Sequence, residues 1–156
     1  MPHINLNSAF GSLTIFEEAG VLVAVEWGQA GGEGENETPL LIEARNQMRA
    51  YFKGSLKKFD LPLAAIGTDF QVAAWRAMSR IPYGMVRTYS DIALDLASGP
   101  RAVGRACGRN PLPILVPCHR VVGRRGHLGG YTGGGGIITK EALLRFEGAL
   151  PLKAAA

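Results

Sequence analysis

Apolar and polar residues alternate with the period of a β-strand near the start of the chain. Leu13 and Ile15 alternate with polar neighbours, and an apolar run rich in valine follows at residues 21–25. An Ala-Gly pair at residues 19 and 20 separates the two stretches and suits a tight turn. The pattern predicts an antiparallel hairpin, followed by a flexible acidic loop over residues 28–37.

The hydrophobic pattern then changes to a helical period. Thr38 can cap a helix whose first position is Pro39, and Gly54 can end it. Residues 55–67 contain a Lys-Lys pair and a proline, which favours a linker or a last edge strand. The apolar positions of the expected helix recur at helical spacing: Leu41, Ala44, Met48 and Phe52.

Three further helices are expected in the middle of the chain. The first follows a capping box formed by Thr68 and Gln71 and ends at a Pro-Tyr-Gly sequence. The second is short and begins with Ser90 as its cap, and the third covers residues 101–109. Two short helices joined by a glycine-containing turn form a helix-turn-helix pattern, which many helical pairs share. The buried face of the first helix would comprise Phe70, Ala74, Ala77 and Ile81.

The last part of the chain combines a short apolar run with a glycine-rich loop. Residues 114–116 predict a short buried strand that Pro117 ends. Seven glycines follow within residues 126–140, without the lysine spacing of a phosphate-binding loop. We interpret this loop as a wall that brings backbone groups close to a flat ligand. Thr139 would cap a last helix, whose final turn contains Glu147.

Composition narrows the class of protein. The chain has 156 residues, of which 47% are hydrophobic and 19% are charged, so we expect a globular fold. No apolar run approaches the roughly 18 residues of a membrane-spanning helix, and the start of the chain lacks the pattern of a signal peptide. We therefore expect a cytoplasmic protein. Two cysteines form no disulfide framework or zinc site, so we expect reduced thiols and no metal.

Charge is distributed unevenly along the chain. Residues 1–65 contain eight carboxylates and five cations, and residues 66–156 contain five carboxylates and twelve cations. The sign of the charge changes near residue 65, where we place a domain boundary. No acidic residue lies between Asp95 and Glu141, an interval with six arginines and one lysine. Such a block suits either a solvated basic surface or a polyanion, and the excess of arginine favours nucleic acid.

The expected helix over residues 101–109 combines arginines with glycines. Arg101, Arg105 and Arg109 recur every four residues and form one stripe, while Val103 and Ala106 can face the core. Gly104 and Gly108 interrupt the helix, and each glycine costs about 1 kcal/mol relative to alanine. Either another helix or a nucleic acid could approach so bare a backbone, and DNA explains both the glycines and the arginines.

Cys118 is the candidate nucleophile. A free thiol has a pKa of about 8.5 and needs a base or a positive field to react as a thiolate. His119 and Arg120 follow it directly, and a third group should orient the imidazole, for which Glu147 is the candidate. The alternative is a buried, inert cysteine, which is common after an apolar run.

The sequence resembles the O6-alkylguanine-DNA alkyltransferases. The similar segments are FQVAAWRAMSRIPYGMVRTYSDIA, RAVGRACGRNP, NPLPILVPCHRV, LGGYTGG and LLRFEG, all within residues 68–150. The resemblance implies an α+β fold in which a small N-terminal α/β domain with an antiparallel sheet (residues 1–65) precedes a mainly helical, winged-helix-like domain with a helix-turn-helix (residues 66–156).

The resemblance also implies roles for individual residues. Cys118 would accept the alkyl group, His119 would act through a water and be held by Glu147, and Asn110 would tie the DNA-binding helix to the active-site turn. Arg101 would enter the base stack in place of the flipped nucleotide. Further DNA contacts are expected from Tyr89, Ser90, Gly104, Arg105, Arg120 and Arg124. The base pocket is expected to include Val121, Tyr131, Thr132 and Lys140.

The implied function is direct reversal of DNA damage. The protein would bind double-stranded DNA through the minor groove, flip the damaged base and take the alkyl group from O6-alkylguanine or O4-alkylthymine in a single turnover. It would need no cofactor and no metal, and we expect a monomer. Two alternatives are a lesion-binding module without repair activity, which the presence of Cys118 disfavours, and a cysteine hydrolase, which leaves the basic block without a role.

Overall fold

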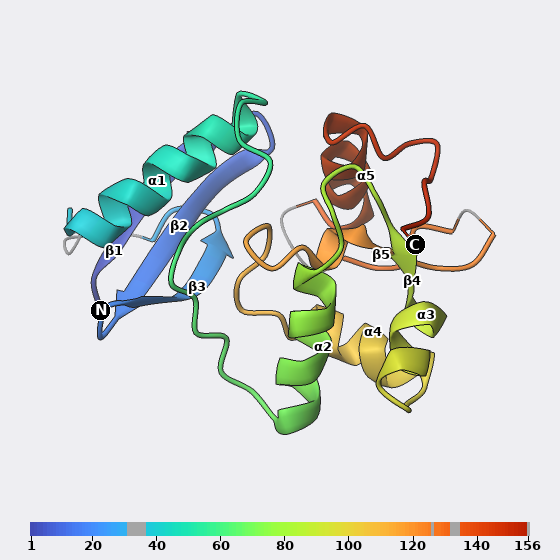
Figure 1. Cartoon of the computed structure of the whole chain (residues 1–156). Coiled ribbons are helices and arrows are strands. Elements are labelled where there is room, and N and C mark those ends of the chain that lie inside the picture. The colour runs from blue at the N-terminus through green and yellow to red at the C-terminus, as the bar shows by residue number, and fades with distance from the viewer. Residues whose placement is uncertain (31–36, 126, 132–134, 156) are drawn as a thin grey trace. The chain divides into compact units, whose positions relative to one another are not determined.

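The computed structural model describes residues 1–30, 37–125, 127–131 and 135–155 (Figure 1). The chain divides into two compact units, Met1–Ile66 and Gly67–Ala156, and each has its own buried core. No helix in the described part of the chain is long and apolar enough to cross a membrane.

The first unit contains a three-stranded antiparallel sheet. Its order is β1 (His3–Ser8), β2 (Gly11–Glu18) and β3 (Val21–Trp27), so the expected hairpin is confirmed as β2 and β3. Both turn residues between these strands, Ala19 and Gly20, have positive φ. Sequence analysis missed β1, although its buried Ile4 and Leu6 alternate with asparagines and carry the same signal.

One helix packs against this sheet. Helix α1 (Pro39–Phe52) begins as expected, since the Thr38 side chain accepts a hydrogen bond from the Leu41 backbone N–H and Pro39 opens the first turn. Burial of its apolar side chains against β1 and β2 stabilises the unit more than helix propensity does. The buried face includes Tyr51 in place of the expected Phe52. It comprises Leu41, Ala44, Met48 and Tyr51.

The second unit is mainly helical. It contains α2 (Asp69–Ser79), α3 (Tyr89–Asp95), α4 (Pro100–Gly108) and α5 (Ile137–Phe146). Two short strands, β4 (Arg87–Thr88) and β5 (Val121–Val122), pair in parallel. Helix α4 packs against both α2 and α3, and the Trp75 indole N–H donates to the Ala106 carbonyl at 2.8 Å. The predicted α+β fold is therefore confirmed, and the helix-turn-helix stays a prediction.

Two helix caps differ from the expected ones. The capping box at Thr68 is confirmed, but α3 is capped by Thr88 rather than Ser90, because Thr88 and Asp91 form a second capping box. Helix α5 begins at Ile137, ahead of the expected cap. Thr139 lies inside the helix, where its hydroxyl accepts a hydrogen bond from the Gly135 N–H.

The strand expected at residues 114–116 is wrong. These residues are buried, but Ile114 has a φ of 73°, which no strand residue adopts. The Val116 N–H donates to the Leu112 carbonyl at 2.8 Å, so the segment turns back on itself. Three nearby prolines favour this turn, since each removes a backbone N–H that a strand would use.

Candidate functional site

The thiol, imidazole and guanidinium of residues 118–120 lie on a turn instead of a strand. A short 3₁₀ helix, η1 (Cys118–Arg120), begins directly after Pro117, and all three side chains are buried. Successive strand residues would point to opposite faces, whereas successive residues of this turn point in three directions. Cys118 borders a pocket, while His119 and Arg120 reach toward the end of α5.

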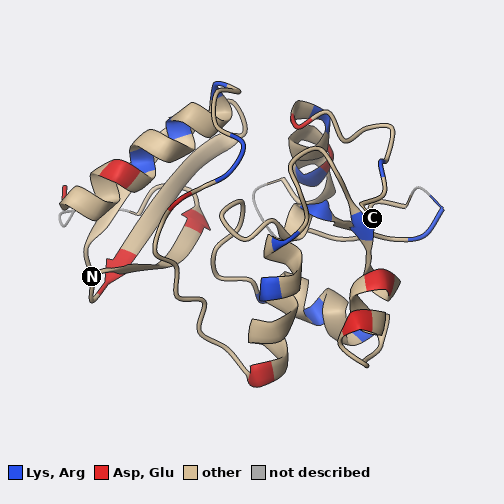
Figure 2. Ribbon diagram, viewed as in Figure 1, with Lys and Arg blue, Asp and Glu red and all other residues tan. Residues whose placement is uncertain are grey.

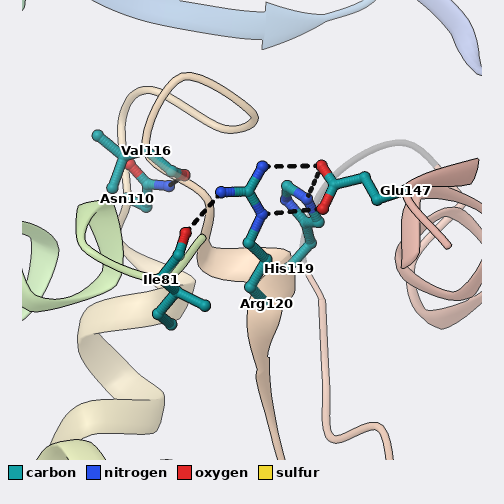
Figure 3. Close-up of polar contacts among 6 residues, drawn as sticks. All are labelled: Ile81, Asn110, Val116, His119, Arg120 and Glu147. Carbon is teal, nitrogen blue, oxygen red and sulfur yellow. Dashed lines mark hydrogen bonds and ion pairs between the residues drawn. The ribbon is translucent and has the colours of Figure 1, made fainter. Parts of the chain in front are cut away.

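Glu147 holds the two basic side chains from the C-terminal end of α5 (Figure 3). The His119 Nε2–H donates to Glu147 Oε2 at 2.9 Å. The Arg120 guanidinium donates twice to the same carboxylate, at 2.8 and 3.0 Å, and once to the Ile81 carbonyl at 2.7 Å. A carboxylate at a helix C-terminus is unfavourable alone, and two basic partners offset that cost.

These contacts fix the protonation of the pair. Burial alone would raise the pKa of Glu147, but the hydrogen bonds and charges of His119 and Arg120 outweigh it and lower the pKa. Burial lowers the pKa of His119, against the opposing effect of Glu147. The lasting positive charge beside the carboxylate is therefore Arg120. Since Nε2 donates its hydrogen to Glu147, a neutral His119 keeps Nδ1 unprotonated and able to accept a proton.

Cys118 lines a pocket of about 380 Å³. Burial raises the pKa of its thiol, while a hydrogen bond with Asn110 and the positive charge of Lys140 lower it. The thiol therefore needs help to ionise, and the site contains both a base and a cation that can give it. The pocket is lined by Tyr89, Pro100, Arg101, Gly104, Cys107, Gly108, Cys118, Gly130 and Tyr131.

Asn110 fastens the segment between α4 and the Cys118 turn. Its Nδ2 donates to the Val116 carbonyl at 2.9 Å, and its Oδ1 accepts from the Leu112 N–H at 2.9 Å. The amide thus uses both its donor and its acceptor to hold the turn that precedes Pro117. This contact places Asn110 between α4 and the nucleophile, and its role in tying a DNA-binding helix to the active-site turn stays a prediction.

Lys140 was expected in the base pocket, but it is fully buried beside the pocket and does not line it. Its Nζ donates to the Val121 carbonyl at 2.6 Å, the Gly130 carbonyl at 3.2 Å and the Tyr89 hydroxyl at 3.2 Å. Burial lowers the pKa of Lys140 to about 8, and the nearby thiols oppose that shift. The amine therefore joins the tyrosine, the glycine loop and β5, and it brings a positive charge near the sulfur.

Gly129 brings the loop backbone against Tyr89. Gly129 has a φ of 76°, and a Cβ atom on it would lie 2.5 Å from the Tyr89 hydroxyl. Any other residue would be strained by its backbone conformation and would collide with the ring. Gly129 thus allows a close approach of the loop backbone to Tyr89, and the approach of this loop to a flat ligand stays a prediction.

Helix α4 presents its arginines to solvent. Arg101, Arg105 and Arg109 are exposed, whereas Val103 and Ala106 are buried as expected. Figure 2 marks the basic positions along the ribbon in blue. A Cβ atom on Gly104 would meet nothing within 4 Å, so packing inside the described chain does not require that glycine. Close helix–helix contact therefore does not explain Gly104.

The other predicted residues fall into three groups. Ser90 and Arg124 hydrogen-bond to each other near the surface, beside Tyr89 and Pro100, which border both this region and the main pocket. Tyr131 lines the main pocket, and the buried Val121 contributes a carbonyl to Lys140. Thr132 lies outside the described residues.

Arg120 does not have the surface position that DNA binding requires. It is buried, and its guanidinium is used by Glu147 and the Ile81 carbonyl. Arg120 was among the residues expected to contact DNA, and its pairing with Glu147, 27 residues away, is not visible from the local sequence.

Sequence analysis also missed residues that line the pocket. Cys107 and Gly108 come from the last turn of α4, and Pro100 comes from its first turn. Cys107 lies three residues after Gly104, so helical spacing places both on the side of Arg101, a signal that could have identified it.

Two models of one protein family match almost the whole chain. The model described as 6-O-methylguanine DNA methyltransferase, ribonuclease-like domain, matches residues 3–65, and the model described as its DNA binding domain matches residues 69–149. A methylated-DNA–protein-cysteine methyltransferase of Methanosarcina acetivorans is 51% identical over 116 residues, which cover 73% of this chain and 72% of the relative. The constitutive enzyme of that name from Bacillus subtilis is 50% identical over 126 residues, covering 79% and 76%.

Solved structures of O6-methylguanine DNA methyltransferases are also similar to this chain. The structure of Mycobacterium tuberculosis OGT in complex with DNA has a TM-score of 0.82 and 40% identity, covering 94% of this chain and 93% of that chain. An O6-methylguanine DNA methyltransferase from Methanococcus jannaschii has a TM-score of 0.69 and 27% identity, covering 98% and 97%.

Proposed function

Because the chain belongs to the 6-O-methylguanine DNA methyltransferase family, we propose that it repairs alkylated DNA by moving the alkyl group onto its own Cys118. The observation that carries this assignment is the position of the Cys118 thiol. It lines a pocket, directly before a histidine that is oriented by a buried carboxylate. Activated nucleophiles share this arrangement of nucleophile, base and orienting group.

Ionisation of the thiol is the first step. His119 Nδ1 is buried and has no hydrogen-bond partner among the described residues, so it can take the proton of Cys118 through a water. Glu147 then stabilises the imidazolium that forms, through the hydrogen bond at Nε2. The ammonium of Lys140 stabilises the thiolate from the other side, because a nearby positive charge favours the ionised form.

Transfer follows by displacement. The thiolate attacks the alkyl carbon, the bond between that carbon and O6 breaks, and guanine leaves with the electron pair. Tyr89 lines the pocket with Lys140 bonded to its hydroxyl, so this pair can supply a proton to the leaving base. The thioether product has no carbonyl for water to attack, so each molecule reacts once. The reaction uses only a thiolate and a leaving base and needs no cofactor.

DNA must deliver the base to the pocket. An alkylated guanine can reach Cys118 only after leaving the base stack, which costs a few kcal/mol. Arg101 is exposed and lines the pocket mouth, so we assign it to filling the vacated space. Gly104 leaves open space on α4 beside Arg105, which suits a minor-groove contact. Tyr89, Ser90 and Arg124 lie at the neighbouring surface, where they would contact the DNA backbone.

The guanine itself would be held by Val121, Tyr131 and Thr132. Lys140 already donates to the Val121 carbonyl, and a carbonyl has a second lone pair that can accept from the base. We further propose that the protein acts as a monomer on double-stranded DNA, with residues 1–65 and 66–156 as its domains. Its location in the cytoplasm stays a prediction.

Intact mass after incubation with duplex DNA tests the proposal. With O6-methylguanine in the duplex, the protein should gain the mass of one methyl group, and peptide mapping should place it on Cys118. Binding without any gain in mass would instead indicate a lesion-binding module. Repeated turnover of an ester or amide, with Cys118 unmodified, would indicate a hydrolase.

A further inference from the structure

The pocket contains a second thiol that the proposed repair reaction does not use. The chain has two cysteines, and both line the same 380 Å³ pocket. They come from different elements, since Cys107 lies in the last turn of α4 and Cys118 begins the 3₁₀ turn. Neither forms a disulfide in this structure.

The surroundings of Cys107 place its sulfur close to the reaction. Its Sγ lies 3.9 Å from the sulfur of Met78, which anchors it at the inner side of α4. Burial and the charge of Cys118 together raise the pKa of Cys107 to about 12, while Lys140 opposes the shift. Cys118 responds to the same lysine. The two thiols therefore share one amine as well as one cavity.

We propose that Cys107 captures the second reactive end of a bifunctional lesion, so that a 2-haloethyl group taken from O6 of guanine ends as a thioether bridge between Cys118 and Cys107. The substrate class is guanine alkylated at O6 by a short chain with a leaving group on its second carbon. This inference rests on the proposed repair function and extends it to a further product.

The chemistry needs no additional reactant. Cys118 first displaces guanine and becomes a 2-haloethyl thioether. Its sulfur then displaces the halide ion from the second carbon and forms a three-membered episulfonium ring. Cys107 sulfur attacks a ring carbon, the carbon–sulfur bond to Cys118 at that carbon breaks, and the thiol proton goes to water. The net result is one two-carbon bridge and one hydrogen halide.

The pocket explains why Cys107 would react first. A haloethyl thioether in open solution reacts with water, and one facing DNA can alkylate the DNA. Here the alkyl group starts on a buried sulfur in a cavity whose wall already includes Cys107. A held nucleophile reacts at a high effective concentration, which compensates for a thiol that is not ionised. The bridge would thus prevent a protein–DNA crosslink.

Intact mass and peptide mapping test the proposal on the whole protein. One sample receives duplex DNA with O6-(2-chloroethyl)guanine, and a parallel sample receives the same duplex with O6-methylguanine. We expect the protein in the first sample to gain the mass of a two-carbon bridge. This gain is smaller by one hydrogen chloride than the gain expected for a chloroethyl adduct. Trypsin cuts after Arg105, Arg109 and Arg120, so it separates the two cysteines unless a bridge joins their peptides.

The parallel samples distinguish failure of the proposed bridge from failure of the proposed repair function. A protein that accepts methyl but yields only a hydroxyethyl adduct, or a DNA crosslink, with Cys107 free would overturn the bridge alone. A protein that accepts no methyl would overturn the repair function itself. The wild-type peptide map gives this result without any variant.

Two variants test the identity of the capturing group. In Cys107→Ser and Cys107→Ala, the bridge between residues 107 and 118 should disappear, and the adduct on Cys118 should end as hydroxyethyl or as a DNA crosslink. Methyl uptake in the same preparations shows whether each variant is folded and active. A bridged mass that persists in an active variant would assign the capture to another residue and refute the role of Cys107.

Discussion

Positive charge is buried in the Cys118 turn and exposed on the outer face of α4. In the turn, Arg120 and His119 are buried, and Glu147 and the Ile81 carbonyl accept hydrogen bonds from the Arg120 guanidinium and from His119 Nε2. On α4 and its C-cap, the side chains of Arg101, Arg105 and Arg109 are exposed and form no hydrogen bond or ion pair among the described residues. In the first region the positive charge is paired within the chain, whereas in the second it is available to a partner.

The buried charges of the Cys118 turn stabilise the site, whereas the exposed arginines of α4 are proposed to bind the DNA that contains the substrate base. Changes in the turn should affect chemistry and stability, because buried charges lose their partners there. Changes on α4 should affect DNA binding and spare the fold, because exposed side chains without partners contribute little to stability.

Cys118→Ala should have the largest effect, a complete loss of alkyl transfer. The variant removes the acceptor atom but none of the exposed arginines, so DNA affinity should stay near that of the wild type. Methyl uptake by mass and duplex binding by fluorescence anisotropy check the two halves. Uptake at the wild-type rate would place the acceptor elsewhere.

Glu147→Gln should destabilise the protein by about 3–5 kcal/mol, the cost of leaving one member of a buried ion pair without its partner. Glu141→Gln is the matched control on the same helix, since its pair with Arg145 is exposed and worth only about 0.3–0.5 kcal/mol. Urea unfolding of the three proteins measures both values. Equal losses in the two variants would contradict a dominant role for the buried network.

Acid should weaken the same network. The folded pKa values of Glu147 and His119 are both lowered, so the unfolded chain takes up protons before the folded chain does. The free energy of unfolding should therefore fall as pH drops below about 6.5 and fall further below about 4.3. Above about pH 4.3 the loss should be smaller than in Glu147→Gln, because the lowered pKa keeps the folded Glu147 carboxylate charged. Urea titrations at several pH values should show this slope, and a reversed slope would refute it.

Arg101→Ala should reduce transfer from duplex DNA on the order of tenfold, about 1.4 kcal/mol. Reaction with free O6-benzylguanine should change less, because that substrate does not have to leave a base stack. Arg109→Ala is the matched control, since it removes the same charge from the same stripe without lining the pocket. Equal losses on both substrates would argue against an intercalating role.

Arg105→Ala should have the smallest effect, a change in salt dependence. Affinity for duplex DNA should fall steeply with salt, and this variant should reduce the logarithmic slope by about 1, as expected for the loss of one phosphate contact. Arg145→Ala, from the ion pair on α5, should leave the slope unchanged. A flat salt response in the wild type would show that α4 does not touch phosphate.

The same contrast explains what the sequence could predict. Helices α1 and α2 were predicted with their caps because capping and apolar periodicity are local signals. The exposed arginine stripe of α4 was also readable, since helical spacing alone defines it. The turn at Ile114 was not, because a buried apolar run looks the same whether it extends or folds back.

Long-range partners limit prediction of the site. Cys118 and His119 could be named from their own chemistry, and Glu147 was named as the group that should orient the imidazole, but Arg120 was expected to contact DNA. Its contact with Glu147 spans 27 residues, and no local pattern reports such a pairing. Lys140 was expected in the base pocket, but its three hydrogen bonds could not be predicted, since the acceptors come from separate segments.

The missing side chain at residue 129 governs the room available to an incoming alkyl group. The loop backbone at Gly129 packs directly against the Tyr89 ring and leaves no space for a Cβ atom between them. This contact restricts movement of both the loop and the ring toward each other. A methyl group at residue 129 would displace either the loop or the Tyr89 ring. Gly129 thus limits the width of the cavity, although it does not line the pocket beside the Cys118 sulfur.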